Sequence, residues 1–460
     1  MSLATGALPQ DTAKKVAEIS ARIERLPLCW FHYKMLLIHG FGWAFDAFDV
    51  GIVTFVVTAL AKDWNLTSGQ IGVILSAGLA GMLVGAIISG YVADIFGRKK
   101  IFQITLLIFC VFSLLCAFAQ NYSTMVIFRF FTGMGLGGET PVVSSLFGEF
   151  IPAKHRGKIQ GQLNTFWAIG WLGAAVISYF IIPSYGWRLA FIAGALPAFF
   201  IWIIRIWLPE SPRWAANRGL LDKAEELIRQ IEDEVRNITR QELPPVEKIA
   251  QLPDTEKISV GVLFSPKYIK RTIMLWVLWF FGMFGYYGLF SWLPTLLVKS
   301  GYSMVKSFSY LVFMQIAYIP NQVLSAFLMD KLGRKWLLFT NLILSACSAI
   351  AYGIVLNGQP GSGVIILVGV ITSWFVSGVW GITYTYTPEL FPTRIRATGT
   401  GSASACSRVG SMLAPIVVGY SLAAVGVQGV FAIVGAAFAI AALFVATMGV
   451  ETRQKVLDEV

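Results

Sequence analysis

The sequence predicts an all-α membrane protein with twelve transmembrane helices in two six-helix halves. Three observations support this prediction. The 460-residue chain is 56% hydrophobic and only 13% charged, apolar stretches long enough to cross a bilayer recur along it, and a block of charged motifs occurs twice. Soluble domains of this length are much more polar. Because backbone groups cannot remain unpaired in lipid, apolar stretches of this length are expected to be helices.

Each expected span is an apolar stretch of about 20 residues or more, the length that crosses a hydrocarbon layer about 30 Å thick. The N-terminal half covers residues 35–208 and the C-terminal half covers residues 270–450. A polar linker of residues 209–269 joins them, and the ends are a segment of residues 1–34 and a tail of residues 451–460. The expected spans are 35–60, 70–93, 101–119, 122–150, 158–182, 188–208, 270–298, 306–328, 336–356, 362–388, 397–424 and 429–450.

The positions of lysine and arginine predict the orientation in the membrane. Most of the 36 basic residues lie in residues 1–34 and in every second loop, whereas the opposite loops hold Lys62, Arg188, Lys299 and Lys306. Basic loops stay in the cytoplasm, so both termini are expected there, in a multi-pass protein of the inner cell membrane. No cleavage signal precedes the first span, so no signal peptide is expected. The net charge of +11 follows from the same asymmetry and requires no nucleic-acid partner.

Cysteine and histidine usage disfavours an enzyme. The five cysteines are scattered singly without Cys-x-x-Cys or Cys/His spacing, so no disulfide, metal site or other cofactor is expected. The sequence has three histidines, no nucleophile–base pattern and no phosphate-binding loop. The expected partners are a small-molecule substrate, protons and the lipid bilayer, and the expected oligomeric state is a monomer.

The linker is predicted to contain an amphipathic helix. Apolar residues between 221 and 238 fall on one helical face, and acidic and basic residues surround the rest. The favoured interpretation is a linker that packs under the bundle, because surface helices of this pattern are common. The alternative is a latch that stabilises one conformation.

Charged motifs occur once in each half. An Asp-x-x-Gly-Arg-Lys block occupies residues 94–99 and 330–335, and a Glu-x-x-Pro-x-x-x-Arg block begins at 149 and again at 389. The string Pro-Glu-Ser-Pro-Arg at 209–213 has a weaker echo, Glu-Thr-Arg, near the C-terminus. Two copies of one membrane unit are typical of carriers that work by alternating access, which disfavours a channel or a receptor that does not transport.

These motifs have the chemistry of gates. A glycine at a helix end permits a tight turn, and a basic pair beside an acid can bind a neighbouring helix and the carbonyls of the helix end. Such contacts must break when that side of a carrier opens. The predicted gating residues are Asp94, Arg98, Glu149, Arg156, Glu210, Arg213, Asp330, Arg334, Glu389 and Arg396.

The first block resembles the loop signature of the major facilitator superfamily, Gly-x-x-x-Asp-x-x-Gly-Arg-Lys, from Gly90 to Lys99, whereas the second has Ala326 at the first glycine. The resemblance extends over nearly the whole chain and implies the major facilitator fold. The Pro-Glu-Ser-Pro-Arg string and the Glu/Arg pairs resemble those of sugar and organic-ion porters within the superfamily.

Ionisable residues inside the predicted spans are candidates for function, because each costs at least about 2.5–3.5 kcal/mol at mid-bilayer. Asp46 and Asp49 lie near one face of the first span, Arg129 and Glu139 lie in the fourth, and Arg408 lies in the eleventh.

The segment that begins at Arg129 resembles the superfamily's fourth-helix signature, whose arginine pairs with a first-helix aspartate in proton coupling. The resemblance assigns Asp49 to this aspartate and Asp46 to its neighbour. An aspartate that loses a cationic partner binds a proton more readily, although a static ion pair that fixes helix packing is the alternative. Glu139 follows a glycine pair, as in anion and organic-acid porters, and either binds a coupling ion or substrate or holds the fourth helix against its neighbour.

The substrate site is expected near the midplane, between the halves. Aromatic residues on the fifth, seventh and tenth spans suit a small flat ring, although many membrane aromatics serve only the core or the interfacial belt. Arg408 adds a cation for an organic acid. Sugar porters carry a glutamine pair where this chain has Phe281 and Gly282, so a sugar is disfavoured. The predicted substrate-binding residues are Arg408, Asn164, Trp167, Trp171, Tyr286, Tyr287, Trp380 and Tyr384.

Five segments, at 42–51, 135–141, 166–171, 384–389 and 394–399, resemble those of the bacterial niacin transporters, which are relatives of the synaptic vesicle glycoproteins. The resemblance implies import of nicotinate or nicotinamide, coupled to protons. A benzoate-type aromatic acid:proton symporter is the closest alternative, and a sugar porter is a weaker one.

Overall fold

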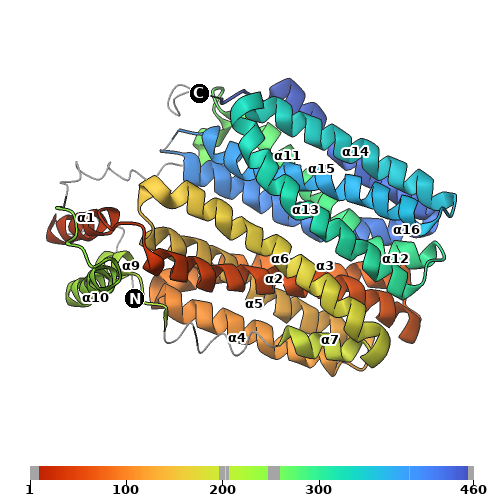
Figure 1. The fold of residues 1–460 in the computed structure, drawn as a ribbon, viewed down its shortest axis with the longest axis horizontal. Helices are drawn as coiled ribbons and strands as arrows, with labels where there is room; N and C mark the ends of the chain where they lie inside the picture. The colour runs from red at the N-terminus through yellow and green to blue at the C-terminus, as the bar shows by residue number, and fades with distance from the viewer. Residues whose placement is uncertain (1–9, 196–202, 204–206, 247–259, 393, 454–460) are drawn as a thin grey trace.

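The computed structural model describes residues 10–195, 203, 207–246, 260–392 and 394–453, and these residues form helices joined by short connections, with no strand among them (Figure 1). The all-α prediction is therefore confirmed. The helices are α1 (Gln10–Glu24), α2 (Trp30–Asp63), α3 (Ser68–Phe96), α4 (Arg98–Ala117), α5 (Tyr122–Phe150), α6 (Ala153–Tyr185), α7 (Trp187–Gly194), α9 (Pro212–Asn217), α10 (Leu221–Thr239), the 3₁₀ helix η2 (Val260–Phe264), α11 (Ile269–Phe290), α12 (Leu293–Lys299), α13 (Met304–Leu332), α14 (Arg334–Asn357), α15 (Ser362–Glu389) and α16 (Arg396–Met448).

Helices α2 to α7 form one bundle and α11 to α16 form a second bundle beside it (Figure 1). Within the described residues, nine helices are long and apolar enough to cross a membrane. Helix α16 contains the last two predicted spans, which are separated at Gly426, where φ is 67°. The seventh predicted span is divided, because α11 ends at Phe290 and α12 begins at Leu293. The sixth predicted span runs from α7 into residues outside the described ranges, so the count of twelve stays a prediction.

Several spans begin at side-chain caps. The Thr67 hydroxyl accepts a hydrogen bond from the Gln70 N–H, and the Gln70 side chain accepts one from the Thr67 N–H. Asn121 accepts from the Thr124 N–H at the start of α5, and Ser303 caps α13 in the same way. These caps satisfy helix-end N–H groups that have no partner within the helix.

The two bundles are in close contact at the end of the molecule that lies away from both termini (Figure 1). Thr58 of α2 and Thr295 of α12 share a hydrogen bond of 2.9 Å between their hydroxyls. Lys299 donates to the Ser68 hydroxyl at 2.8 Å. Polar contacts between the bundles therefore close this end, which we call the far end.

The opposite end carries both termini and a small group of helices, α1, α9 and α10, outside the N-terminal bundle (Figure 1). We call it the basic end, because the turns at Gly97 and Gly333 with their Arg-Lys pairs also lie there. Helix α10 occupies the predicted amphipathic stretch. Helix α1, which had not been predicted as a helix, packs on α9 and α10 through an apolar cluster of Ile19, Ile23, Trp214, Ala215, Ala216, Ala224 and Ile228.

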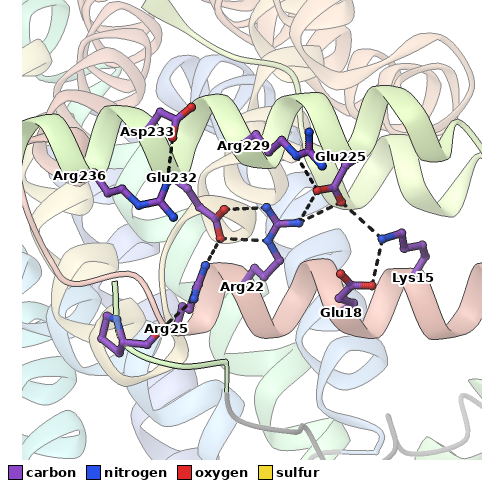
Figure 2. A network of polar contacts seen from close by, with 10 residues as sticks. Lys15, Glu18, Arg22, Arg25, Glu225, Arg229, Glu232, Asp233 and Arg236 are labelled. Carbon is purple, nitrogen blue, oxygen red and sulfur yellow. Dashed lines mark hydrogen bonds and ion pairs between the residues drawn. The ribbon is translucent and has the colours of Figure 1, made fainter. Parts of the chain in front are cut away.

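An ion-pair network joins α1 to α10 (Figure 2). Arg22 lies 2.8 Å from Glu225 and 2.6 Å from Glu232, and Arg25 lies 2.6 Å from the other oxygen of Glu232. Hydrogen bonds from Arg22 lower the pKa of Glu225. Burial alone would raise the pKa of Glu232, but hydrogen bonds from Arg22 and Arg25 outweigh burial and leave it below its ordinary value. The network therefore fastens the N-terminal segment to the linker.

Candidate functional site

A buried ion pair joins α2 to α5 inside the N-terminal bundle. Arg129 Nη1 lies 2.8 Å from Asp49 Oδ2, and the two side chains are 2% and 0% exposed. Ser113 of α4 donates to the other Asp49 oxygen at 3.4 Å. Close packing of α3 on α5 surrounds the pair, because Gly78 and Gly133 face each other with no room for a Cβ on Gly133. The structure thus places Asp49 against Arg129 as the sequence predicts, and the role of this pair in coupling stays a prediction.

Two acidic side chains meet one turn away. The carboxyl groups of Asp46 on α2 and Glu139 on α5 lie within hydrogen-bonding reach of each other, and both residues are almost completely buried. Among the described residues, Asp46 Oδ1 and both Glu139 oxygens receive no hydrogen bond from a donor. Two carboxylates this close repel each other, whereas one shared proton makes the contact a hydrogen bond. The pair is therefore a site that can hold a proton.

Arg408 faces this carboxyl pair from the C-terminal bundle. Its guanidinium, on α16, interacts electrostatically with Asp46, Tyr287 and Tyr384 and is half-buried. In the part of the chain that the structure describes, Arg408 takes part in none of the ion pairs of 4 Å or less. A cation held inside a membrane protein without a contacting carboxylate is suited to bind an anion from outside the protein.

Aromatic rings from both bundles surround the same region. Tyr286 on α11 is in ring contact with Trp171 on α6 and with Trp380 on α15, at centroid distances of 6.2 and 6.0 Å. The side chain of Trp167 also interacts with that of Tyr286. Tyr384 lies 6.3 Å from Trp380 and is 41% exposed, so solvent reaches this aromatic group at Tyr384. These predicted substrate-binding residues are therefore neighbours in space.

Two indole N–H groups in the aromatic group have no acceptor within the described part of the chain. Trp171 and Trp380 are 1% and 5% exposed, and neither Nε1 donates a hydrogen bond to any described residue. A buried donor without an acceptor is costly, by about 1–3 kcal/mol. The neighbouring Trp279 shows the ordinary arrangement, because its Nε1 donates to the Thr387 hydroxyl at 2.9 Å. The two free N–H groups are therefore available to a ligand.

A small cavity lies at the boundary between the bundles. Its volume is about 10 Å³, which is room for about one water molecule. Arg129 and Gly78 line it from the N-terminal bundle, and Tyr287 and Ser291 line it from α11 and its end. Since Tyr287 also faces Arg408, this residue borders both the buried ion pair and the unpaired cation.

The first copy of the charged motifs forms a network at the basic end. Arg98 lies 2.7 Å from Glu149 and 3.5 Å from Asp94. Glu210, which follows the N-terminal bundle, accepts from the Lys99 backbone N–H at 3.2 Å in the first turn of α4. A carboxylate at this position is favoured by the exposed N–H groups of the helix start.

The second copy repeats this arrangement. Arg334 lies 3.2 Å from Glu389 and 2.9 Å from Asp330. Glu451 accepts from the Arg334 backbone N–H at 2.8 Å and so caps α14 as Glu210 caps α4. The weak sequence echo near the C-terminus therefore has a structural counterpart.

The central arginine of each network joins neighbouring helices of one bundle, Arg98 of α4 to α5 and Arg334 of α14 to α15. Gly97 and Gly333 precede α4 and α14 with φ of 103° and 88°, a conformation that L side chains rarely adopt. Arg213 forms an ion pair with α1, and Arg396 donates to a carbonyl at the end of α15. The side chain of Arg156 lies outside those that the structure describes. A gating role for these residues stays a prediction.

Three residues of the aromatic region are absent from the predicted set of substrate-binding residues. Trp279 lies 5.2 Å from Tyr384 between ring centroids, and Tyr318 of α13 lies 6.5 Å from Tyr286. Gln315, one turn before Tyr318, is buried, and its Nε2 has no partner among the described residues. An amide inside an apolar span was the available signal. For the predicted Asn164, the side chain is not among those described.

A family model for sugar (and other) transporters matches residues 25–460. The chain belongs to this family. Its spans and the two bundles are thus those of a membrane transporter of the major facilitator superfamily, and the prediction that the protein is a transporter rather than an enzyme is confirmed.

Two curated relatives match along almost their whole lengths. The niacin transporter NiaP of Acinetobacter baylyi is 43% identical, over 96% of this chain and 99% of its own. The putative niacin/nicotinamide transporter NiaP of Bacillus subtilis is 39% identical, over 92% and 98%. The fold is similar to the inward open xylose transporter XylE from E. coli, with a TM-score of 0.73 over 93% of this chain and 98% of that one, at 20% identity.

Proposed function

We propose that the protein imports nicotinate by alternating access, together with protons, and accepts nicotinamide less well. The observation that carries the proposal is Arg408, a cation that contacts no carboxylate among the described residues and that interacts with Tyr384 of the aromatic group and with Asp46 of the carboxyl pair. The names of the two niacin-transporter relatives support the choice of cargo.

The cargo fits the chemistry of the region. A pyridine ring stacks on aromatic faces such as those of Tyr286 and Trp380, and its carboxylate accepts charge-assisted hydrogen bonds from Arg408. The free indole N–H groups of Trp171 and Trp380 supply further donors to the same small anion. Nicotinamide has the same ring but no negative charge, so it cannot form the charge-assisted hydrogen bond with Arg408.

The coupled proton is held by the carboxyl pair. When nicotinate is at Arg408 and one proton lies between Asp46 and Glu139, the occupied site carries no new net charge, which lowers the cost of moving it through the membrane. Opening of the basic end, which the positive-inside rule places in the cytoplasm, then releases both. Separation of Asp49 from Arg129 during this motion gives a second carboxylate that can bind a proton.

Competition for uptake tests the cargo. Cells or proteoliposomes that contain the protein are given labelled nicotinate with excess nicotinate, nicotinamide, benzoate or glucose. The proposal predicts strong competition by nicotinate, weaker competition by nicotinamide and none by glucose. Stronger competition by benzoate than by unlabelled nicotinate would favour an aromatic-acid symporter, and absence of nicotinate uptake would refute the proposal.

A further inference from the structure

A row of titratable groups runs along α2 from the carboxyl pair toward the basic end. His32 and His39 precede Asp46 by fourteen and seven residues, so all three lie on one face of the helix. Successive members are about 10.5 Å apart along the axis, at about 1.5 Å per residue. The chain has three histidines, and the third, His155 at the start of α6, interacts electrostatically with His32. All the histidines therefore lie between the carboxyl pair and the basic end.

His39 is fixed in one tautomer with a free acceptor nitrogen. Its Nδ1 lies 2.6 Å from the Met35 carbonyl oxygen, and because a carbonyl only accepts, Nδ1 must carry the hydrogen of the neutral ring. The lone pair is then on Nε2. The side chain is completely buried, and Nε2 has no hydrogen-bond partner among the described residues.

Glu139 reaches toward His39 across Gly42. Gly42 lies one turn after His39, and the space where its side chain would be is occupied by Glu139 Oε1. The Phe102 ring stacks on His39 at 6.2 Å and also lies 3.4 Å from the position of a Gly42 Cβ. Glu139 Oε1 thus lies beside Gly42, about one helical turn along α2 from His39, and the Phe102 ring borders both.

We propose that His39 accepts the proton that leaves the Asp46–Glu139 pair and passes it toward the cytoplasm. This inference rests on the proposed proton symport. The carboxylic O–H bond breaks, the proton crosses through a water molecule, and a new N–H bond forms at Nε2, while Nδ1 keeps its hydrogen bond to Met35. The imidazolium then returns its Nε2 proton to water on the side of His32. The carboxyl pair is left with one more negative charge, which the next proton from outside neutralises.

Apolar rings and acidic side chains surround His39. The rings of Phe102 on α4 and Phe147 on α5 cover it, the latter at a centroid distance of 5.0 Å. Toward the far end, the charged and titratable groups on the packed helices include Asp46, Glu139 and the Asp49–Arg129 ion pair. Toward the basic end, they are His32 and His155, and the Glu149 carboxylate, which is paired with Arg98. No lysine or arginine contacts His39 among the described side chains, so its protonation depends on the acids around it.

The test uses the full-length protein in proteoliposomes, with His39→Gln as the variant, because glutamine keeps polar contacts but cannot carry a proton at neutral pH. Nicotinate accumulation driven by an imposed pH gradient is expected to fall about tenfold or more, while exchange of labelled for unlabelled nicotinate at equal pH stays near wild type. The dependence of uptake on internal pH should also flatten. His39→Glu should restore part of the gradient-driven uptake, since a carboxylate can carry the proton.

Phe147→Leu is the matched control, because it loosens the packing of the same ring without removing its nitrogen. It should leave both activities near wild type. Gradient-driven accumulation by His39→Gln that equals wild type, with an unchanged pH profile, would overturn the relay alone. Equal loss of exchange and accumulation in His39→Gln, or loss of accumulation alone in Phe147→Leu, would assign His39 a structural role. If wild-type protein does not respond to a pH gradient, both the relay and the proposed symport are wrong.

Discussion

Charged side chains at the basic end and inside the bundles use the same residue types in opposite ways. At the basic end Arg22 bonds two carboxylates at 2.6–2.8 Å, and Glu232 receives bonds from two arginines (Figure 2). Inside the bundles Glu139 faces a second acid, and Arg408 has no carboxylate in contact among the described residues. In the first network each of these charges contacts an opposite charge outside the bundles, whereas the second lacks such contacts among the described residues, in the interior where burial costs most.

This contrast separates buried charges that stabilise the fold from buried charges that serve transport. A buried charge whose partners are all present stabilises the folded protein, and this stabilisation is enough to explain why the charge is there. Incomplete pairing in a membrane interior costs free energy of folding, so it must be retained for a partner that comes and goes. Asp49 and Arg129 lie between these cases, since they are fully paired to each other in this conformation.

Asp49→Asn should abolish uphill, pH-dependent nicotinate uptake, by about 100-fold or more, while substrate exchange continues. The amide keeps the shape of the side chain but cannot cycle a proton. Arg129→Gln should fail similarly, because it releases the aspartate from its partner. Uptake against a gradient and exchange are measured side by side in proteoliposomes. Wild-type accumulation by Asp49→Asn would place this ion pair with the structural network at the basic end.

Arg408→Gln should weaken nicotinate binding by about tenfold or more, since a charged hydrogen bond contributes about 1.5–3 kcal/mol. Neutral nicotinamide should lose much less. Titration calorimetry of both ligands on the purified variant measures the two dissociation constants. Equal losses for both ligands would show that Arg408 holds the fold around a buried acid and does not contact the substrate carboxylate.

Trp380→Phe should weaken nicotinate binding by about two- to tenfold, because it removes a free N–H while it keeps a stacking ring. Trp279→Phe is the matched comparison, since the N–H of Trp279 is already bonded to Thr387. That variant should lose thermal stability and retain affinity. The opposite pattern in a paired binding and melting measurement would mean that the free indole is not used by the ligand.

Glu232→Gln should lower the free energy of unfolding by about 1 kcal/mol at neutral pH and leave uptake almost unchanged. The pKa of Glu232 is lowered in the folded protein, so its stabilising contribution is present above the ordinary value of 4.5 and is lost as the pH falls through the folded value. Melting curves of wild type and variant should therefore converge at acidic pH. A difference that grows on acidification would contradict the assigned network.

Part of this arrangement could be predicted from the sequence, and part could not. The repeated Asp-x-x-Gly-Arg-Lys blocks and the Asp49–Arg129 pair were predictable because each depends on local spacing or on a resemblance carried by a short motif. The docking of α1 on α10 could not be predicted. Ile19 and Ile23 form only a short apolar stripe, and the partner helix is about 200 residues away along the sequence. The contact between Asp46 and Glu139 depends on the helix packing that Gly42 permits, which no pattern within one span encodes.

The break between α11 and α12 was missed for a similar reason. Residues 273–298 contain no charged side chain, and Pro294 is the only backbone signal near Trp292. A proline in the first turn of a helix is compatible with either a continuous span or a new start. The tertiary contact that decides between them is the bond from the Trp292 indole to the Pro415 carbonyl of α16.

Proton movement coupled to nicotinate entry tests the central claim most directly. Nicotinate is added to weakly buffered proteoliposomes that have no imposed gradient, and the external pH is followed while entry of labelled nicotinate is measured in the same suspension. The account predicts that the external medium becomes more alkaline in proportion to the nicotinate that enters, with no such change in protein-free liposomes. Entry of nicotinate through the protein without any change in external pH would contradict it.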